Sequence, residues 1–107
     1  MGKRDNRITE LIAHEAAQFI LRESSGQSLI TVTRAVLSKN AEHAMVFVSI
    51  FPHEEAKPAL SFLSRLTGDF RAHLATRSRL HPLPKIEFVL DEGELNRQHL
   101  DELTKKS

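Results

Sequence analysis

The basic side chains of segment 57–85 are the residues whose type and spacing point most directly to chemistry. The segment holds six Lys and Arg residues and one acidic residue, Asp69, whereas the whole chain carries a formal net charge of only +1. Positive charge gathered in one stretch of a nearly neutral protein predicts a binding site for a polyanion. The alternative is a solvated helix face that happens to be rich in arginine, which composition alone favours. The six basic residues are Lys57, Arg65, Arg71, Arg77, Arg79 and Lys85.

The histidines invite a metal or acid–base interpretation that their spacing does not support. None lies in a His-x-x-x-His or comparable ligand spacing, and the chain has no cysteine to complete a site. Each is therefore predicted to be a solvated surface residue. The sequence also lacks a nucleophile elbow and a glycine-rich phosphate loop. We predict no enzyme, no cofactor and no metal. The histidines are His14, His43, His53, His73, His81 and His99.

The length of 107 residues corresponds to one domain with a modest core. The absence of cysteine agrees with a reducing compartment. No apolar run approaches the roughly 20 residues that a membrane span needs, and the N-terminus lacks the apolar region of a signal peptide. These features predict a cytoplasmic protein without a membrane partner.

Hydrophobic periodicity predicts a helix over about 7–23, with Asp5 or Asn6 as its cap. Strands are predicted at 29–37 and 44–51, and the short connection makes them an antiparallel hairpin. Ala44, Val46, Val48 and Ile50 form the expected inward face of the second strand. Arg34 breaks the alternation of the first strand, so that either a bulge intervenes or its stem packs while its head reaches solvent.

Segment 58–80 has the apolar spacing of one buried helical face, which Gly68 interrupts. The segment is either one long kinked helix or two short helices that share this face. A glycine merely tolerated in a regular helix is the alternative for Gly68. We expect Gly68 to hold the kink in a conformation that alanine cannot adopt. The shared face consists of Leu60, Leu63, Leu66, Phe70 and Leu74.

A third strand at 86–90 completes an α+β architecture of order α-β-β-α-(kink)-α-β. Three strands with all the helices on one face make a two-layer sandwich, and the long crossover before the third strand permits a mixed sheet. This is the arrangement of the type II KH module, although the KH G-x-x-G loop is absent. We predict a flexible basic arm at 1–5, a KH-like domain at 6–91 and a weakly ordered C-terminal tail at 92–107.

Five motifs in this order resemble the bacterial ribosome-binding factor A family. R-I-T-E-L-I begins the first helix, and V-T-R-A-V-L-S and A-M-V-F-V-S lie in the two hairpin strands. L-S-R-L-T-G-D-F-R-A-H-L spans the helical kink, and P-K-I-E-F-V-L-D covers the third strand. Each motif is weak alone, but five at matching spacing are fairly specific. The motifs occupy Arg7–Ile12, Val32–Ser38, Ala44–Ser49, Leu63–Leu74 and Pro84–Asp91.

The resemblance implies a KH-like fold in which an A-x-G kink replaces the G-x-x-G loop. It implies a non-enzymatic assembly factor, active as a monomer, that binds the small (30S) ribosomal subunit and its 16S rRNA. The factor would assist late maturation of the subunit and processing of the rRNA 5′ end. Three positions depart from the family pattern: Leu66 replaces the kink alanine, His81 replaces an arginine, and Asn40 replaces the usual hairpin Asp.

Arg71, Arg77 and Arg79 are the predicted principal phosphate contacts, because the guanidinium suits bidentate phosphate geometry. The other predicted RNA-binding residues are Arg65, Gly68 and Lys85 in the same segment, with Lys3, Arg4 and Arg34 as secondary candidates. The rival hypothesis is a protein–protein interaction module that uses the exposed sheet face bearing Phe47 and Phe51. A steep fall of affinity with salt would favour RNA over this rival.

Overall fold

Three helices and a three-stranded sheet make up the part of the chain that the computed structural model describes, which is residues 3–24, 26 and 28–93. For residues 3–6 the description covers the backbone alone. No helix among the described residues is long and apolar enough to cross a membrane. The elements are α1 (Lys3–Glu23), β1 (Leu29–Leu37), β2 (His43–Phe51), the 3-10 turn η1 (His53–Glu55), α2 (Ala56–Arg65), α3 (Thr67–Arg77) and β3 (Lys85–Leu90).

The sheet has the strand order β1-β2-β3, with β2 in the centre. β1 and β2 form an antiparallel hairpin, and β3 lies parallel to β2 on its other side. The parallel pairing requires a crossover, which η1, α2 and α3 supply. The predicted hairpin and the mixed sheet are both confirmed. Each predicted strand lies within one residue of its observed bounds.

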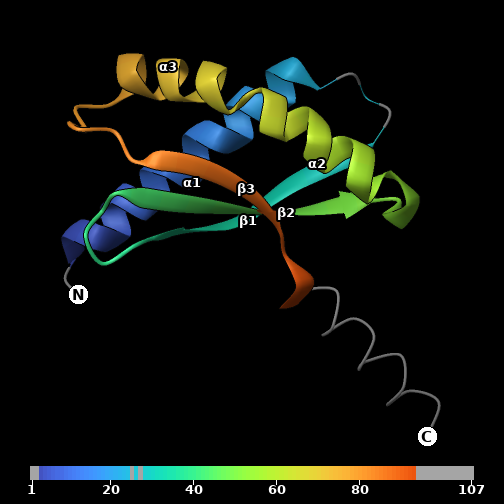
Figure 1. Ribbon diagram of the computed structural model, residues 1–107, viewed down its shortest axis with the longest axis horizontal. Helices are drawn as coiled ribbons and strands as arrows, with labels where there is room; N and C mark the ends of the chain where they lie inside the picture. Colours follow the sequence, from blue (N-terminus) through green and yellow to red (C-terminus); the bar gives the residue numbers. More distant parts are fainter. Residues whose placement is uncertain (1–2, 25, 27, 94–107) are drawn as a thin grey trace, which may run out of the picture.

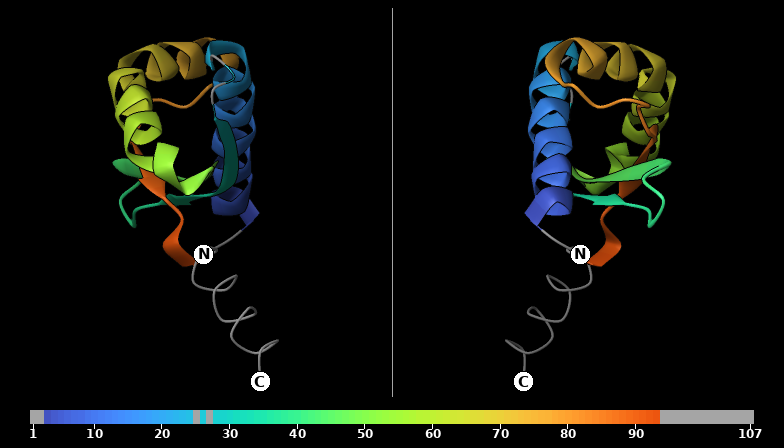
Figure 2. Two further views of the ribbon diagram at one scale, coloured as in Figure 1. Left: turned by 90° about the vertical axis from the view of Figure 1, so that its right-hand side faces the viewer. Right: turned by 90° about the vertical axis from the view of Figure 1, so that its left-hand side faces the viewer.

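The helices cover one face of the sheet, as Figures 1 and 2 show. The inward residues of β2 are at most 5% exposed and form the middle of the core. Helix α1 adds Ile12, Ala16, Phe19 and Ile20, all of them buried. The predicted two-layer α+β architecture and the inward face of β2 are thus confirmed. The β2 core residues are Ala44, Val46, Val48 and Ile50.

A β-bulge in β1 resolves the anomaly at Arg34. Val32 pairs with Val48 and Arg34 with Phe47, so that Thr33 is the extra residue in the hairpin register. The insertion reverses which side chains face the core, because alternation restarts after the bulge. Arg34 consequently lies on the solvent side, while Ala35 packs against the core. The bulge was one of the two arrangements that the sequence left open.

Helices α2 and α3 are two separate helices that meet at Leu66. Leu66 has φ −99° and ψ 3°, and its N–H donates to the Leu63 carbonyl in a tight 3-10-type bond of 2.9 Å. The predicted shared face is present, since Leu63, Phe70 and Leu74 are completely buried. The break therefore lies at the position where the family pattern has alanine, and not at the glycine.

The expectation that Gly68 holds the kink is wrong. Gly68 lies within α3, its φ is outside the left-handed region, and a Cβ built on it would have no neighbouring atom within 4 Å. Glycine is required where φ is positive or where a neighbouring atom leaves no room for a Cβ, and neither condition holds at Gly68. Packing of Leu63 and Phe70 on the sheet, on either side of Leu66, fixes the angle between the helices instead.

Two predicted boundaries also need correction. Helix α1 begins at Lys3 and not near Arg7, so that Asp5 and Asn6 lie inside the helix and do not cap it. Lys3–Asp5, predicted to belong to a flexible arm, are helical. Of the C-terminal tail predicted at 92–107, only Glu92 and Gly93 are described, and residues 94–107 lie outside the description.

We expect Gly68→Ala to raise the free energy of unfolding by about 0.5–1 kcal/mol, because alanine favours a helix and restricts the unfolded chain. A urea titration measures this as a higher midpoint at unchanged slope. Leu66→Gly is the matched comparison at the true junction, and it should destabilise because Leu66 packs against the core. A lower midpoint for Gly68→Ala would contradict this account of the helix junction.

Candidate nucleic-acid interface

A cavity of about 910 Å³ lies at the end of the molecule where the β1–β2 turn meets the α3–β3 connection. Helix α1 supplies one wall, the hairpin turn a second, and the segment that leads into β3 a third. The lining combines an apolar floor with a basic rim. The residues that line it are Arg7, Ile8, Leu11, Leu37, Asn40, Ala41, Glu42, His43, Arg71, Arg79, Leu80, His81, Pro82, Leu83 and Lys85.

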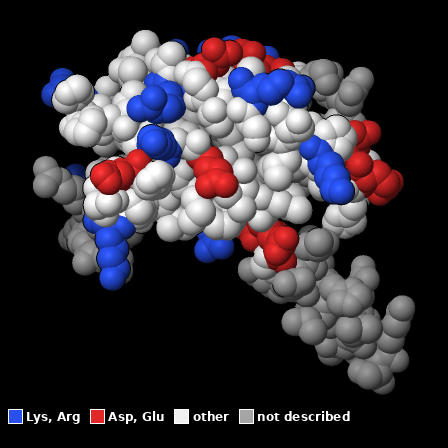
Figure 3. All heavy atoms as spheres, in the orientation of Figure 1, with Lys and Arg blue, Asp and Glu red and all other residues white. Residues whose placement is uncertain are grey.

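Four cationic side chains and one carboxylate, that of Glu42, lie around this cavity. The cations come from α1, from α3 and from the chain between α3 and β3 with the first residue of β3, and all four residues are exposed. Within the described residues none of the four forms an ion pair. Figure 3 shows several Lys and Arg groups at this end, at the left of the view, with acidic atoms among them, and further basic groups toward the right. The four cations are Arg7, Arg71, Arg79 and Lys85.

Arg71 organises the wall that precedes β3. Its Nε donates to the Pro84 carbonyl at 3.1 Å, and its Nη2 donates to the Leu83 carbonyl at 3.3 Å. These bonds attach α3 to a segment that has no regular structure of its own. Because a guanidinium carries five N–H donors, Arg71 retains others that can face a ligand. Arg71 therefore positions the segment that separates Arg79 from Lys85.

The hairpin turn forms the opposite wall and is fixed by its own side chains. Asn40 Oδ1 accepts from the Glu42 N–H at 3.1 Å, and Ser38 Oγ accepts from the His43 N–H at 3.1 Å. Both are side-chain-to-backbone bonds of the kind that Ser and Asn make in turns. The Lys85 N–H donates to the Glu42 carbonyl at 2.8 Å, which joins the turn to β3. The cavity thus has two walls that are held by hydrogen bonds.

Arg7 was not among the residues predicted to bind RNA. Local sequence carried no signal for it. Arg7 lines the cavity together with the hairpin turn and the segment before β3, which are far from it in the chain.

The other predicted residues whose side chains are described do not line this cavity. Arg77 lines a hollow of about 380 Å³ between α1 and α3. Arg65 borders a hollow of about 240 Å³ beside α2. Gly68 is exposed on α3, and the side chains of Lys3 and Arg4 lie outside the description. The basic residues of segment 57–85 therefore do not form one surface: Arg65 and Arg77 line other hollows than the basic cavity.

Arg34 lies on the outer face of the sheet. Its guanidinium carbon is 4.1 Å from the centroid of the Phe47 ring, a cation–π geometry. Its Nε also lies 3.9 Å from Asp91 Oδ2, which accepts a hydrogen bond of 2.5 Å from Thr33 Oγ1. Arg34 thus covers Phe47, one of the two aromatic residues on which the rival hypothesis depended. Phe51 remains 68% exposed.

The prediction that every histidine is a solvated surface residue is wrong for His73. Its side chain is only 10% exposed and packs against the rings of Phe19 and Phe70. Arg22 Nη2 donates to His73 Nδ1 at 3.3 Å, so that the ring hydrogen lies on Nε2, which donates to Glu15 Oε1 at 2.9 Å. Its position three residues after Phe70 placed it beside the apolar face, a signal that could have identified it.

The chemistry available at the basic cavity is recognition of phosphate. Arginine and lysine donors around an uncharged floor can bind a phosphodiester backbone, and the Leu and Pro side chains can contact sugars or bases. No group of three or more His, Cys, Asp or Glu residues within the described ranges could hold a metal ion.

Comparison with known proteins gives concordant matches. The family model described as ribosome-binding factor A matches residues 4–104. The ribosome-binding factor A of Thermodesulfovibrio yellowstonii is 33% identical over 106 residues, covering 97% of this chain and 90% of that protein. That of Trichormus variabilis is 33% identical over 97 residues, covering 86% and 73%.

Solved structures give the same match. The crystal structure of ribosome-binding factor A from Thermus thermophilus is 31% identical, with a TM-score of 0.72 over 80% of this chain and 93% of that one. A homology model of the Thermus thermophilus factor, fitted into a cryo-electron microscopy map of its 30S complex, is 31% identical with a TM-score of 0.65. It covers 84% of this chain and 93% of the model.

Arg71→Ala removes two hydrogen bonds to backbone carbonyls, and we expect it to lower the free energy of unfolding by about 1–2 kcal/mol. Arg79→Ala is the matched control, because Arg79 is exposed and makes no hydrogen bond with the described residues; its effect should stay within about 0.5 kcal/mol. Denaturant titration compares the two. Equal stabilities would show that Arg71 does not hold the β3 connection.

Proposed function

The chain belongs to the ribosome-binding factor A family, and from this we propose that it binds the small ribosomal subunit through 16S rRNA at the basic cavity. The observation that carries the proposal is the convergence of Arg7, Arg71, Arg79 and Lys85 on one cavity. None of the four is paired with a carboxylate among the described residues, so that each can attract phosphate. The Thermus thermophilus relative, described in complex with the 30S subunit, supports the choice of partner.

The cavity residues have distinct proposed roles. Arg79, Lys85 and Arg7 contact phosphates, since all three are exposed on the rim. Arg71 positions the segment between Arg79 and Lys85 and offers its remaining donors outward. Beyond the rim, an RNA strand that continues along α3 would meet Gly68 and Arg77, which lie on that helix. Arg65 on α2, Arg34 on the outer face of the sheet, and Lys3 and Arg4 of α1 remain secondary proposed contacts that one such strand does not join.

The biological role that we propose is assistance in late maturation of the small subunit, including processing of the 16S rRNA 5′ end. The protein acts by binding and not by catalysis, as a cytoplasmic monomer without a cofactor. Membership of a family of ribosome-binding factors supports this role. A binding protein can favour one conformation of an RNA only by its differential affinity for that conformation.

The salt dependence of binding tests the interface. Arg79→Ala with Lys85→Ala should weaken binding to purified small subunits on the order of tenfold at moderate salt and reduce the slope of log K against log salt by about one per lost contact. Lys57→Ala is the matched control for Lys85→Ala, because Lys57 is exposed and does not line the cavity. An unchanged slope in the double variant would remove these residues from the interface.

Depletion of the protein tests the biological role. We expect small subunits to accumulate with 16S rRNA that is unprocessed at its 5′ end, measured by primer extension. The native chain should restore processing, and the Arg79→Ala, Lys85→Ala chain should restore it poorly. Normal 5′ ends in depleted cells would contradict the proposed role in maturation.

A further inference from the structure

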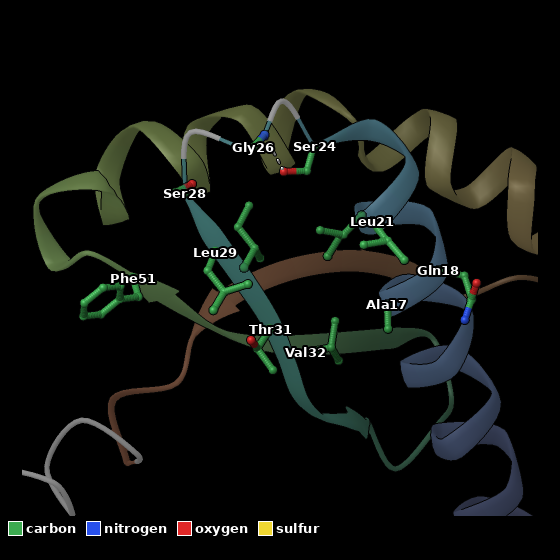
Figure 4. A pocket seen from close by; sticks show the side chains of 12 residues that line it. Ala17, Gln18, Leu21, Ser24, Gly26, Ser28, Leu29, Thr31, Val32 and Phe51 are labelled. Carbon is green, nitrogen blue, oxygen red and sulfur yellow. Dashed lines mark hydrogen bonds between the residues drawn. The ribbon is translucent and has the colours of Figure 1, made fainter.

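An uncharged groove lies near the other end of β1, between the C-terminal half of α1 and the first residues of the strand. Its cavity volume is about 650 Å³. Figure 4 shows its lining along β1 and the facing turns of α1, with Phe51 on the far side of Leu29 from that helix. The side chains that matter for the argument are Ala17, Leu21, Leu29, Ile30, Val32 and Phe51.

Exposed apolar side chains concentrate at this groove. Among the described residues, five large hydrophobic side chains are exposed, and the three most exposed all line it. Leu21, Leu29 and Phe51 are 78%, 66% and 68% exposed, respectively. Burial of such side chains is worth about 25 cal/mol per Å² of apolar surface removed from water. Their grouping in one groove is typical of a surface that a partner covers.

The electrostatic character of the groove is opposite to that of the basic cavity. None of the described residues that line it carries a charge, although 27% of the chain is Asp, Glu, Lys or Arg. Phosphate recognition requires cationic or directed N–H donors, and the groove offers no cation. Absence of charge on this surface favours an uncharged, apolar partner over RNA.

The backbone of β1 specifies the form of that partner. β1 is an edge strand, and within the described part of the chain it pairs with β2 on one side only. An edge strand presents N–H and C=O groups that an extended peptide can pair with. The bulge at Thr33 ends the regular edge, so that Leu29–Val32 is the regular part, and these four residues all line the groove.

We propose that the groove binds an extended, uncharged, apolar segment of a small-subunit protein, which adds to the edge of β1 as a fourth strand. The side chains of Leu21, Leu29 and Phe51 contact the apolar side chains of that segment. Four residues of strand span about 13 Å, so the docked segment has about four paired residues. This inference rests on the proposed function for the identity of the larger partner.

Paired serine substitutions test the groove. Leu21→Ser with Leu29→Ser removes two exposed apolar side chains, and Val36→Ser with Met45→Ser is the matched control, at 36% and 37% exposure outside the groove. We expect the groove variant to bind purified small subunits at least fivefold more weakly, by the same factor at low and high salt, because no phosphate contact is lost. The control should bind as the native chain does. Circular dichroism checks that both variants are folded.

A photo-crosslink identifies what occupies the groove. Benzoylphenylalanine at position 29, in the complex with purified small subunits, should crosslink to a ribosomal protein, and the same probe at position 45 should not. A crosslink to rRNA alone, or native affinity of the groove variant, would overturn the inference while the proposed function stands. If the native chain does not bind small subunits, the proposed function fails and this inference fails with it.

Discussion

The burial of one face of β2 is the constraint on which the rest of the structure depends. β2 is the central strand, and its alternate residues from Ala44 to Ile50 are covered by the helices. A shift of the β2 register by one residue would turn Met45, Phe47 and Ser49 toward the helices in place of this set. The register of β2 is therefore strongly specified. The bulge at Thr33 follows from the same constraint, because it directs Ala35 toward the core and Arg34 toward solvent. The hairpin register therefore determines where the basic cavity and the uncharged groove lie.

The parts of the fold that depend on local periodicity could be predicted from the sequence. The alternation in β2 and the helical spacing of Leu63, Phe70 and Leu74 reported their burial correctly. Parts that depend on contacts between distant residues could not be predicted. The low helix propensity of glycine pointed to Gly68 as the kink. The break lies instead at Leu66, between the buried residues Leu63 and Phe70. The sequence likewise could not show that Arg7 shares a cavity with segment 79–85.

In the proposed complex, the two surfaces near opposite ends of β1 would contribute to affinity by different physical means. Phosphate contacts at the basic cavity would weaken as salt concentration rises, because counterions compete for the RNA backbone. Burial of Leu21, Leu29 and Phe51 depends on apolar area and is nearly independent of salt at moderate concentration. A ribosomal subunit presents both RNA and protein. A small factor that contacts both can gain specificity that phosphate contacts alone do not provide.

The arginines of the basic segment cannot be treated as equivalent charges. Arg71 commits two donors to the Leu83 and Pro84 carbonyls, in the segment between Arg79 and Lys85. These bonds hold the segment between the two cations in place, so that the proposed binding of RNA would cost less conformational entropy than binding by a free loop. Lysine in place of Arg71 would keep the charge but could not reproduce the planar guanidinium that reaches both carbonyls. The value of Arg71 to the interface thus lies as much in the geometry that it imposes as in its charge.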